Sequence, residues 1–236
     1  GGLSVVADAR EALEALSDVL GDYSVGDEYR TRTVELAHEW DDTVSAGAGN
    51  DRISAVALAA QAIVLSLDGG DGDDTVAGGA GAETLRGGDG DDSIDGNAGA
   101  DVGLMGDGDD TFVWDNGDGS DVIEGQEGAD TMIFNGAAGA EQFDLSANGN
   151  RLRFFRVQGN ITMDTAGVER VEVNAFGGAD LVTLNDLTGT DVTEVNVDLA
   201  ATPGGLTGDG AADRVVVNAA NGGATITASG DAGGVG

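Results

Sequence analysis

The 236-residue chain has no cysteine, one proline, one histidine and few aromatic residues, and its ten basic residues are all arginine. The lack of cysteine excludes disulfides, thiolate zinc sites, iron–sulfur clusters and cysteine nucleophiles. A single histidine excludes sites that need two imidazoles, and the lack of lysine excludes Schiff-base and P-loop chemistry. No run approaches the ~18 apolar residues of a membrane span. The first residues show no signal peptide, so we expect a processed chain or a fragment of a longer one.

Acidic residues dominate the charge of the chain. The 44 Asp and Glu residues against 10 Arg give a formal net charge of −34. Such a charge repels phosphate groups, so we expect neither nucleic acid nor an anionic membrane as a partner. With 42 glycines as well, composition alone would be typical of a disordered chain. The order of the residues indicates a folded chain instead.

From residue 69 the chain repeats a nine-residue unit in five consecutive blocks, which read GGDGDDTVA, GGAGAETLR, GGDGDDSID, GNAGADVGL and MGDGDDTFV. Each block has an acid at its sixth position, and two further acids follow after a two-residue insertion: Asp74, Glu83, Asp92, Asp101, Asp110, Asp121 and Asp130. An apolar residue follows two positions after most of these acids: Val76, Leu85, Ile94, Phe112, Ile123 and Met132. Gly103 is the one exception.

This pattern resembles the nonapeptide G-G-x-G-x-D-x-U-x of RTX (hemolysin-type) proteins, a secreted calcium-binding family. The resemblance covers residues 67–133 well and the rest of the chain more loosely. It implies an all-β fold, a parallel β-roll or β-solenoid with calcium ions between the turns of successive rungs. The sixth-position acids and turn carbonyl groups would be the ligands. It also implies export through a type I secretion channel, extracellular localisation and folding outside the cell.

The residues support the same interpretation independently of the resemblance. Each unit offers a glycine-rich turn and a very short strand with one inward apolar residue, so two units make a solenoid turn of eighteen residues. The DGDD blocks recur with that longer period, which predicts one edge rich in acids and another with about one acid per turn. Two carboxylates on strands ~4.8 Å apart repel by ~1 kcal/mol in water and ~3.5 kcal/mol at an effective dielectric constant of 20.

A hard divalent ion with oxygen ligands would turn this repulsion into attraction, and flexible ligand spacing favours calcium over magnesium. We therefore expect several calcium ions. The candidate ligands are acids and turn glycines of the repeats: Asp51, Asp71, Asp73, Asp74, Glu83, Asp89, Asp91, Asp92, Asp101, Asp107, Asp109, Asp110, Asp121, Asp130, Gly70, Gly72, Gly88, Gly90, Gly106 and Gly108.

Four segments are expected along the chain. Residues 1–30 hold a helical pattern at 4–20, which either caps the roll or docks a partner, and residues 31–133 form the roll. Residues 134–167 form an antiparallel β insert with Asn148-Gly149 as a hairpin turn, serving as a local core or as a partner-binding patch. Residues 168–236 form a second, degenerate solenoid stretch, where Asp180 and Asp213 are calcium ligands or turn residues.

No catalytic motif accompanies the repeats, so we expect that the chain is not an enzyme. His38-Glu39 has no second histidine, and no G-x-S-x-G elbow is present. The first functional hypothesis is an extracellular structural, adhesive or self-assembling element that folds on binding calcium. Its further partners would be a second copy stacked end to end, or a cell-surface or matrix component. The alternative is a repeat module of a larger secreted enzyme or toxin.

Overall fold

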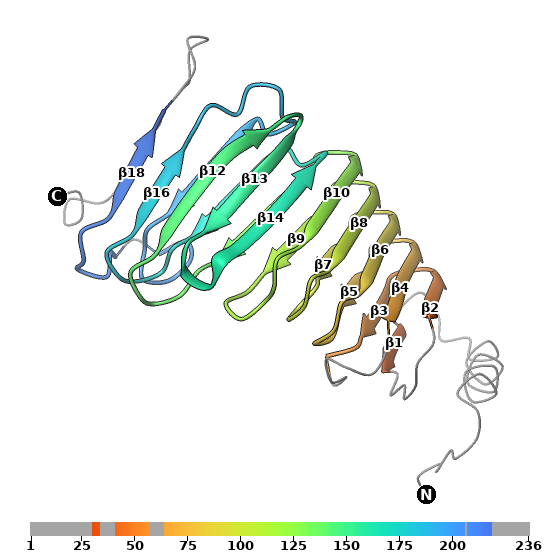
Figure 1. Cartoon of the computed structure of the whole chain (residues 1–236). Coiled ribbons are helices and arrows are strands. Elements are labelled where there is room, and N and C mark those ends of the chain that lie inside the picture. Colours follow the sequence, from red (N-terminus) through yellow and green to blue (C-terminus); the bar gives the residue numbers. More distant parts are fainter. Residues whose placement is uncertain (1–29, 34–40, 57–63, 206, 219–236) are drawn as a thin grey trace, which may run out of the picture.

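The structure, a computed structural model, describes residues 30–33, 41–56, 64–205 and 207–218, which wind into a solenoid of two facing β-sheets (Figure 1). One sheet has eight strands in the spatial order β1 (Arg30–Thr33), β3 (Asp51–Ser54), β5 (Thr75–Ala77), β7 (Ser93–Asp95), β9 (Thr111–Trp114), β11 (Thr131–Asn135), β15 (Arg170–Asn174) and β17 (Glu194–Asp198). The other has ten strands in the order β18 (Arg214–Val217), β16 (Leu181–Leu184), β12 (Gln142–Asn148), β13 (Arg151–Arg156), β14 (Ile161–Ala166), β10 (Val122–Glu127), β8 (Val102–Asp107), β6 (Thr84–Asp89), β4 (Val64–Asp71) and β2 (Asp41–Ala48).

Successive strands of the repeat region alternate between the two sheets and pair in parallel with the strand one turn away. Thr75 pairs with Ser93, which pairs with Thr111, so the turns of the solenoid between these residues have the expected eighteen residues. Thr111 then pairs with Thr131, and the longer interval reflects the two-residue insertion. The all-β parallel roll expected from the sequence is confirmed.

Two rows of turns connect the sheets. The first edge consists of the turns that lead from the ten-stranded to the eight-stranded sheet, at 72–74, 90–92, 108–110 and 128–130. The second edge consists of the turns that lead back, at 78–83, 96–101, 115–121 and 136–141. The acids of the DGDD blocks lie at the first edge or at the strand ends that flank it, as the charge period predicts.

The core lies between the sheets and contains every apolar residue that the repeat predicts. Val76, Leu85, Ile94, Phe112, Ile123 and Met132 are all 0% exposed. The exception at Gly103 has a packing reason, because a Cβ there would lie 2.7 Å from Cε2 of Phe112. The large Phe112 ring on β9 therefore fills the space that a side chain on β8 would need.

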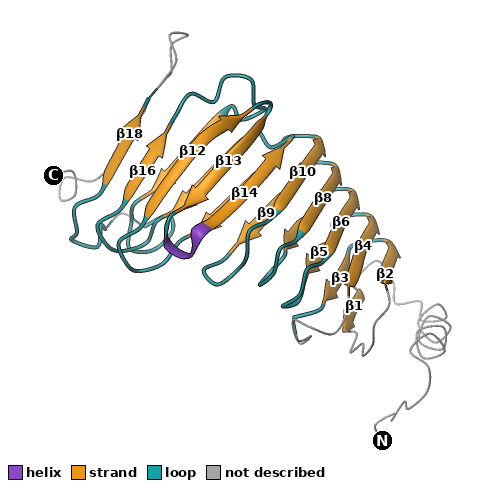
Figure 2. Ribbon diagram, viewed as in Figure 1, coloured by secondary structure: helices purple, strands orange, loops and turns teal. Residues whose placement is uncertain are grey.

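The antiparallel insert is also confirmed, and it lies within the ten-stranded sheet rather than beside it. β12 pairs antiparallel with β13, and β13 pairs antiparallel with β14. The outer strands of this trio pair in parallel with the solenoid, β14 with β10 and β12 with β16. A short 3-10 turn, η1 (Gln158–Asn160), joins β13 to β14 (Figure 2).

A cluster of aromatic rings fills the core behind the insert. Trp114 and Phe134 stack with ring centroids 3.9 Å apart, and Phe154 lies 4.3 Å from Phe134. Phe143 meets Phe134 edge to face at 5.8 Å. These rings come from β9, β11, β12 and β13, so the insert shares one core with the solenoid.

The described residues do not test the remaining predictions about the segments of the chain. The helix expected at 4–20 and the end of the chain after residue 218 lie outside the described residues. The boundaries at residues 31, 134 and 168 stay predictions. Within the part of the chain that the structure describes, no helix is long and apolar enough to cross a membrane.

Candidate metal centres

A column of buried acids runs along the first edge. It consists of Asp51, Asp74, Asp92, Asp110 and Asp130, which are each at most 3% exposed. The backbone N–H of each acid donates a hydrogen bond to Oδ1 of the next acid in the column, over 2.6 to 2.9 Å. The N–H of Asp130 continues the column to Oε2 of Glu169 at 2.8 Å. One carboxylate oxygen of Asp74, Asp92, Asp110 and Asp130 is thus used to join one rung to the next.

The second edge carries the same arrangement in two pieces. The N–H of Glu83 donates to Asp101 Oδ1 at 2.7 Å, and the N–H of Asp101 donates to Asp121 Oδ1 at 2.9 Å. Beyond the insert, Glu141 donates to Asp180 Oδ1 and Asp180 to Asp213 Oδ1, at 2.8 and 3.0 Å. The sixth-position acids therefore act as rung-to-rung connectors at both edges.

The second carboxylate oxygen of six of these acids has no hydrogen-bond partner. The atoms are Oδ2 of Asp74, Asp92, Asp101, Asp110, Asp121 and Asp130, all buried. A buried polar atom without a partner costs roughly 1–3 kcal/mol, and more when it is charged. Six such atoms in regular array indicate a ligand that supplies positive charge.

Glycines leave room for these oxygens. At Gly87 a Cβ would lie 2.2 Å from Asp92 Oδ2 and 2.3 Å from the carbonyl oxygen of Met105. At Gly69 it would lie 2.3 Å from Asp74 Oδ2 and 2.5 Å from the carbonyl oxygen of Gly87. A carboxylate oxygen and a carbonyl oxygen of the following rung thus converge beside Gly69 and Gly87, where a side chain would clash with both.

A second set of glycines shapes the turns of the first edge. Six of them have φ between +111° and +141°: Gly70, Gly72, Gly88, Gly90, Gly106 and Gly108. This left-handed region favours glycine. The rungs also approach closely here, since a Cβ on Gly88 would lie 1.9 Å from the carbonyl oxygen of Gly70. The predicted turn glycines therefore present their carbonyl oxygens in a row along the edge.

The remaining acids of the DGDD blocks lie outside the buried column. Asp73, Asp91 and Asp109 are exposed and form an outer ladder, in which the N–H of Asp91 donates to Asp73 Oδ1 and that of Asp109 to Asp91 Oδ1. Asp71, Asp89 and Asp107 are exposed too and pair with one another at the ends of β4, β6 and β8. The first edge therefore has an inner row of buried acids and two outer rows.

Burial is the main influence on the inner acids. It raises the pKa of Asp74, Asp110 and Asp130 from the ordinary value near 3.8 to about 6, and neighbouring acids raise it further. The same cause raises the pKa of Asp92 and Asp121 to about 7 and that of Asp101 to about 8. The hydrogen bond that each accepts from a backbone N–H opposes the shift without cancelling it. A cation is the partner that would keep these groups ionised at neutral pH.

The donor set fits calcium. Within the described ranges, no three Asp, Glu or His side chains gather at one point, so any metal ligand set must combine carboxylate with backbone oxygens. All these donors are oxygens, which suit a hard cation, and calcium accepts carboxylate and carbonyl oxygens in irregular geometry. Asp74, Asp92, Asp110 and Asp130 would hold ions at the first edge, and Asp101 and Asp121 at the second.

Glu83 behaves differently from the aspartates at equivalent positions. Its longer side chain curls back so that Oε2 accepts a hydrogen bond from the N–H of Gly79 in its own turn, at 2.9 Å. Burial still raises its pKa. Glu83 was predicted as a calcium ligand, but one of its carboxylate oxygens already accepts a hydrogen bond from the backbone of its own turn.

The sequence-based list missed several acids that share these environments. Glu141 ends the turn GAAGAE at 136–141, twenty residues after Asp121, but it lies in the segment read as an insert. Asp118 lies in the turn 115–121, and burial raises its pKa to about 6. Glu169 ends the first-edge column with no nonapeptide around it. The twenty-residue interval from Asp121 could have predicted Glu141 as a member of the column. No sequence pattern predicts the position of Glu169.

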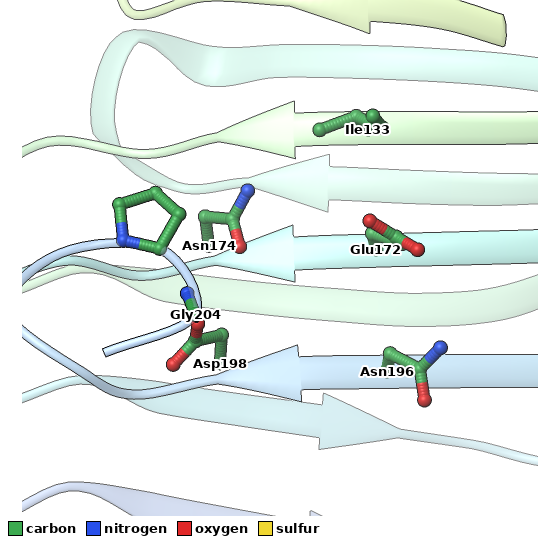
Figure 3. A pocket seen from close by; sticks show the side chains of 7 residues that line it. Ile133, Glu172, Asn174, Asn196, Asp198 and Gly204 are labelled. Carbon is green, nitrogen blue, oxygen red and sulfur yellow. The ribbon is translucent and has the colours of Figure 1, made fainter. Parts of the chain in front are cut away.

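A surface hollow is lined by none of the acids with unpartnered oxygens. It is on the outer face of the eight-stranded sheet, with a volume of about 440 Å³ (Figure 3). Its lining consists of two amides, two carboxylates, two apolar residues and a glycine: Ile133, Glu172, Asn174, Asn196, Asp198, Pro203 and Gly204. The unpartnered carboxylate oxygens belong to the turns, so the metal centres are placed at the edges and not in this hollow.

These features define the chain as a parallel β-roll whose turns are lined with buried carboxylates. Comparison with protein families finds four copies of the RTX calcium-binding nonapeptide repeat, at residues 41–55, 66–82, 77–112 and 116–140. No match was found among curated proteins or among solved structures. The stretch from residue 41 to residue 140 belongs to the RTX calcium-binding nonapeptide-repeat family.

Proposed function

We propose that this chain is an extracellular calcium-binding β-roll that folds when calcium binds and serves as a structural, adhesive or self-assembling element. The observation that carries the proposal is the regular array of buried carboxylate oxygens without a hydrogen-bond partner. Calcium bound at these oxygens would neutralise the acids and link successive turns. The proposed role is mechanical, and we propose no catalytic activity for the chain.

The folding switch follows from the position of the acids. In the unfolded chain the carboxylates are solvated and far apart, whereas folding buries them in columns. A ligand that binds the folded chain far better than the unfolded chain shifts the equilibrium towards folding by mass action. A low calcium concentration would keep the chain unfolded for export, and a high concentration outside the cell would fold it. This is the setting in which RTX repeats typically act.

Self-assembly has a structural basis in the ends of the sheets. Among the described residues, β17 and β18 each pair with one neighbour, at the same end of the solenoid (Figure 1). An edge strand offers backbone groups to a further strand. End-to-end stacking of copies is the assembly that this geometry favours.

The test is a calcium titration of the chelated chain, followed by far-UV circular dichroism and light scattering on one sample, with magnesium as the control. We expect a disordered spectrum that turns to β-structure with calcium and not with magnesium. Scattering that rises in parallel would support assembly, and flat scattering would favour the alternative of a module in a larger secreted protein. A β-spectrum that persists in chelator at pH 7.5 would contradict the folding switch.

A further inference from the structure

The second edge divides where the insert enters the ten-stranded sheet. β9 and β11 are neighbours in the eight-stranded sheet, and the turns 115–121 and 136–141 lead the chain away from them. These turns enter β10 and β12, which β14 and β13 separate in the ten-stranded sheet (Figure 2). Two turns that start on adjacent strands therefore diverge, and the rung-to-rung hydrogen bonds between sixth-position acids stop at Asp121.

The side chain of Arg156, the last residue of β13, lies between the diverging turns. Its Nε donates to Oε1 of Glu141 at 2.5 Å, and its Nη2 donates to Oδ1 of Asn116 at 3.0 Å. Nη2 also pairs with Oε1 of Glu141. The guanidinium carbon lies 5.4 Å from the centre of the Trp114 ring. With 7% exposure for Arg156 and 2% for Glu141, this charge pair is buried.

Glu141 is the sixth-position acid of its turn, but it differs from the aspartates in one respect. Its Oε1 is bound by Arg156, and its Oε2 accepts from the N–H of Ala137 at 2.6 Å. Both carboxylate oxygens of Glu141 are thus satisfied, and its negative charge has a cationic partner. At Asp101 and Asp121, on the same edge, Oδ2 has no partner.

We propose that the guanidinium of Arg156 takes the place of a calcium ion at the turn 136–141. This inference rests on the proposed function, because it assumes that the acids of the neighbouring turns hold calcium. The turn keeps the glycines and the buried acid of a calcium-binding unit, and the chain supplies the positive charge itself. In the folded chain, the fork between the turns is therefore held together without a calcium ion at the turn 136–141. On the second edge, we therefore expect calcium ions at the turns of Asp101 and Asp121 and none at the turn 136–141.

An arginine suits this position for physical reasons. Its charge does not titrate in the physiological range, and its planar donors bind two acceptors in different directions at once. Here those acceptors come from the two diverging turns. A calcium ion there would use oxygens of the turn 136–141, whereas the guanidinium also reaches Asn116 in the turn 115–121.

The first test counts bound calcium ions by isothermal titration calorimetry in the full chain and in two variants. D121N should bind one ion fewer than the parent chain, whereas E141Q should bind the same number. If E141Q also loses an ion, Glu141 is a calcium ligand and the inference is wrong. If the parent chain binds no calcium, the proposed function fails and not merely this inference.

A second pair of variants covers the case in which E141Q does not fold. R156M leaves Glu141 without its partner, so it should bind one additional calcium ion, and calcium should restore its thermal stability further than that of the parent. R153M is the matched control, because Arg153 lies on the same strand, is half-exposed and is 3.8 Å from Asp144. An unchanged ion count in R156M, with a loss of stability that calcium does not reduce, would identify an ordinary salt bridge and overturn the inference.

Discussion

Six buried aspartates of the edge columns use their two carboxylate oxygens for different purposes: Asp74, Asp92, Asp101, Asp110, Asp121 and Asp130. Oδ1 accepts a backbone N–H from the neighbouring rung, and Oδ2 remains for an ion. The first contact orients the carboxylate before any ion arrives, so the ligand is preorganised by the backbone of another turn. Loss of Oδ1 should therefore weaken the contact between rungs, whereas loss of the Oδ2 charge should weaken calcium binding.

Replacing Asp92 by Asn removes the charge in the middle of the first-edge column while keeping the shape of the side chain. We expect one bound ion fewer and a roughly tenfold higher calcium concentration at the folding midpoint, since charged hydrogen-bond partners are worth about 1.5–3 kcal/mol. Calcium-dependent circular dichroism and calorimetry measure both. D186N, on an exposed loop, is the control and should change neither. Equal effects of the two variants would remove Asp92 from the ligand set.

Replacing Gly88 by Ala tests the close approach of the rungs. The residue has φ of +125°, and the added Cβ would lie 1.9 Å from the carbonyl oxygen of Gly70. We expect G88A to destabilise the calcium-bound roll by more than about 2 kcal/mol in thermal unfolding. Gly139 has open space around its Cβ position, so G139A should stay within about 0.5 kcal/mol of the parent. Similar unfolding temperatures for the two variants would refute the steric argument.

At the scale of the elements, the two sheets compensate for each other across the core. Gly103 on β8 interrupts the row of inward apolar residues, and Phe112 on β9 occupies the space from the opposite sheet. The unit with Gly103 lacks an inward side chain, and the large Phe112 of the next unit fills the space. The core is filled at this position although the nonapeptide pattern is broken.

This compensation can be tested with a double-mutant cycle. G103A should overpack the core, because the methyl group would lie 2.7 Å from the Phe112 ring, and we expect a cost of about 1–3 kcal/mol in urea unfolding with calcium. F112L should cost a similar amount by leaving a cavity. The double variant G103A/F112L should be more stable than the sum of the single effects indicates. Strict additivity would contradict a direct contact.

At the scale of the whole molecule, the buried acids couple folding to pH. Their raised pKa values mean that the folded, calcium-free chain binds more protons than the unfolded chain between about pH 4 and pH 8. Stability falls with rising pH wherever the folded state holds more protons. Proton binding therefore stabilises the calcium-free roll at acidic pH, and this contribution disappears as pH rises through the folded-state pKa values of about 6 to 8.

We expect the calcium-free chain to show more β-structure at pH 5 than at pH 8, and calcium to bind more tightly at pH 8. Calcium would compete with protons for the same carboxylates, so binding near pH 7 should release protons. Circular dichroism after calcium removal and calorimetry in buffers of different ionisation enthalpy measure the two effects. More structure at pH 8 than at pH 5 without calcium would contradict the linkage.

The nonapeptide by itself was sufficient to predict the parallel roll, the inward residues and the two unequal edges. The reason is that these features repeat every nine or eighteen residues, so each local unit specifies its own turn, strand and neighbour. Asp92 and Val76 take their places because of their position in the unit. The hairpin at Asn148-Gly149 was predictable for the same local reason.

The tertiary structure alone decided what happens where the period breaks. The sequence does not show that β13 and β14 separate β10 from β12, because that pairing joins residues far apart without a common interval. The fork in the second edge, the break in the column between Asp121 and Glu141 and the burial of Arg156 against Glu141 all follow from this pairing. Likewise, only the packing of rung on rung shows that one oxygen of each of the six aspartates accepts a backbone N–H while the other is left for an ion.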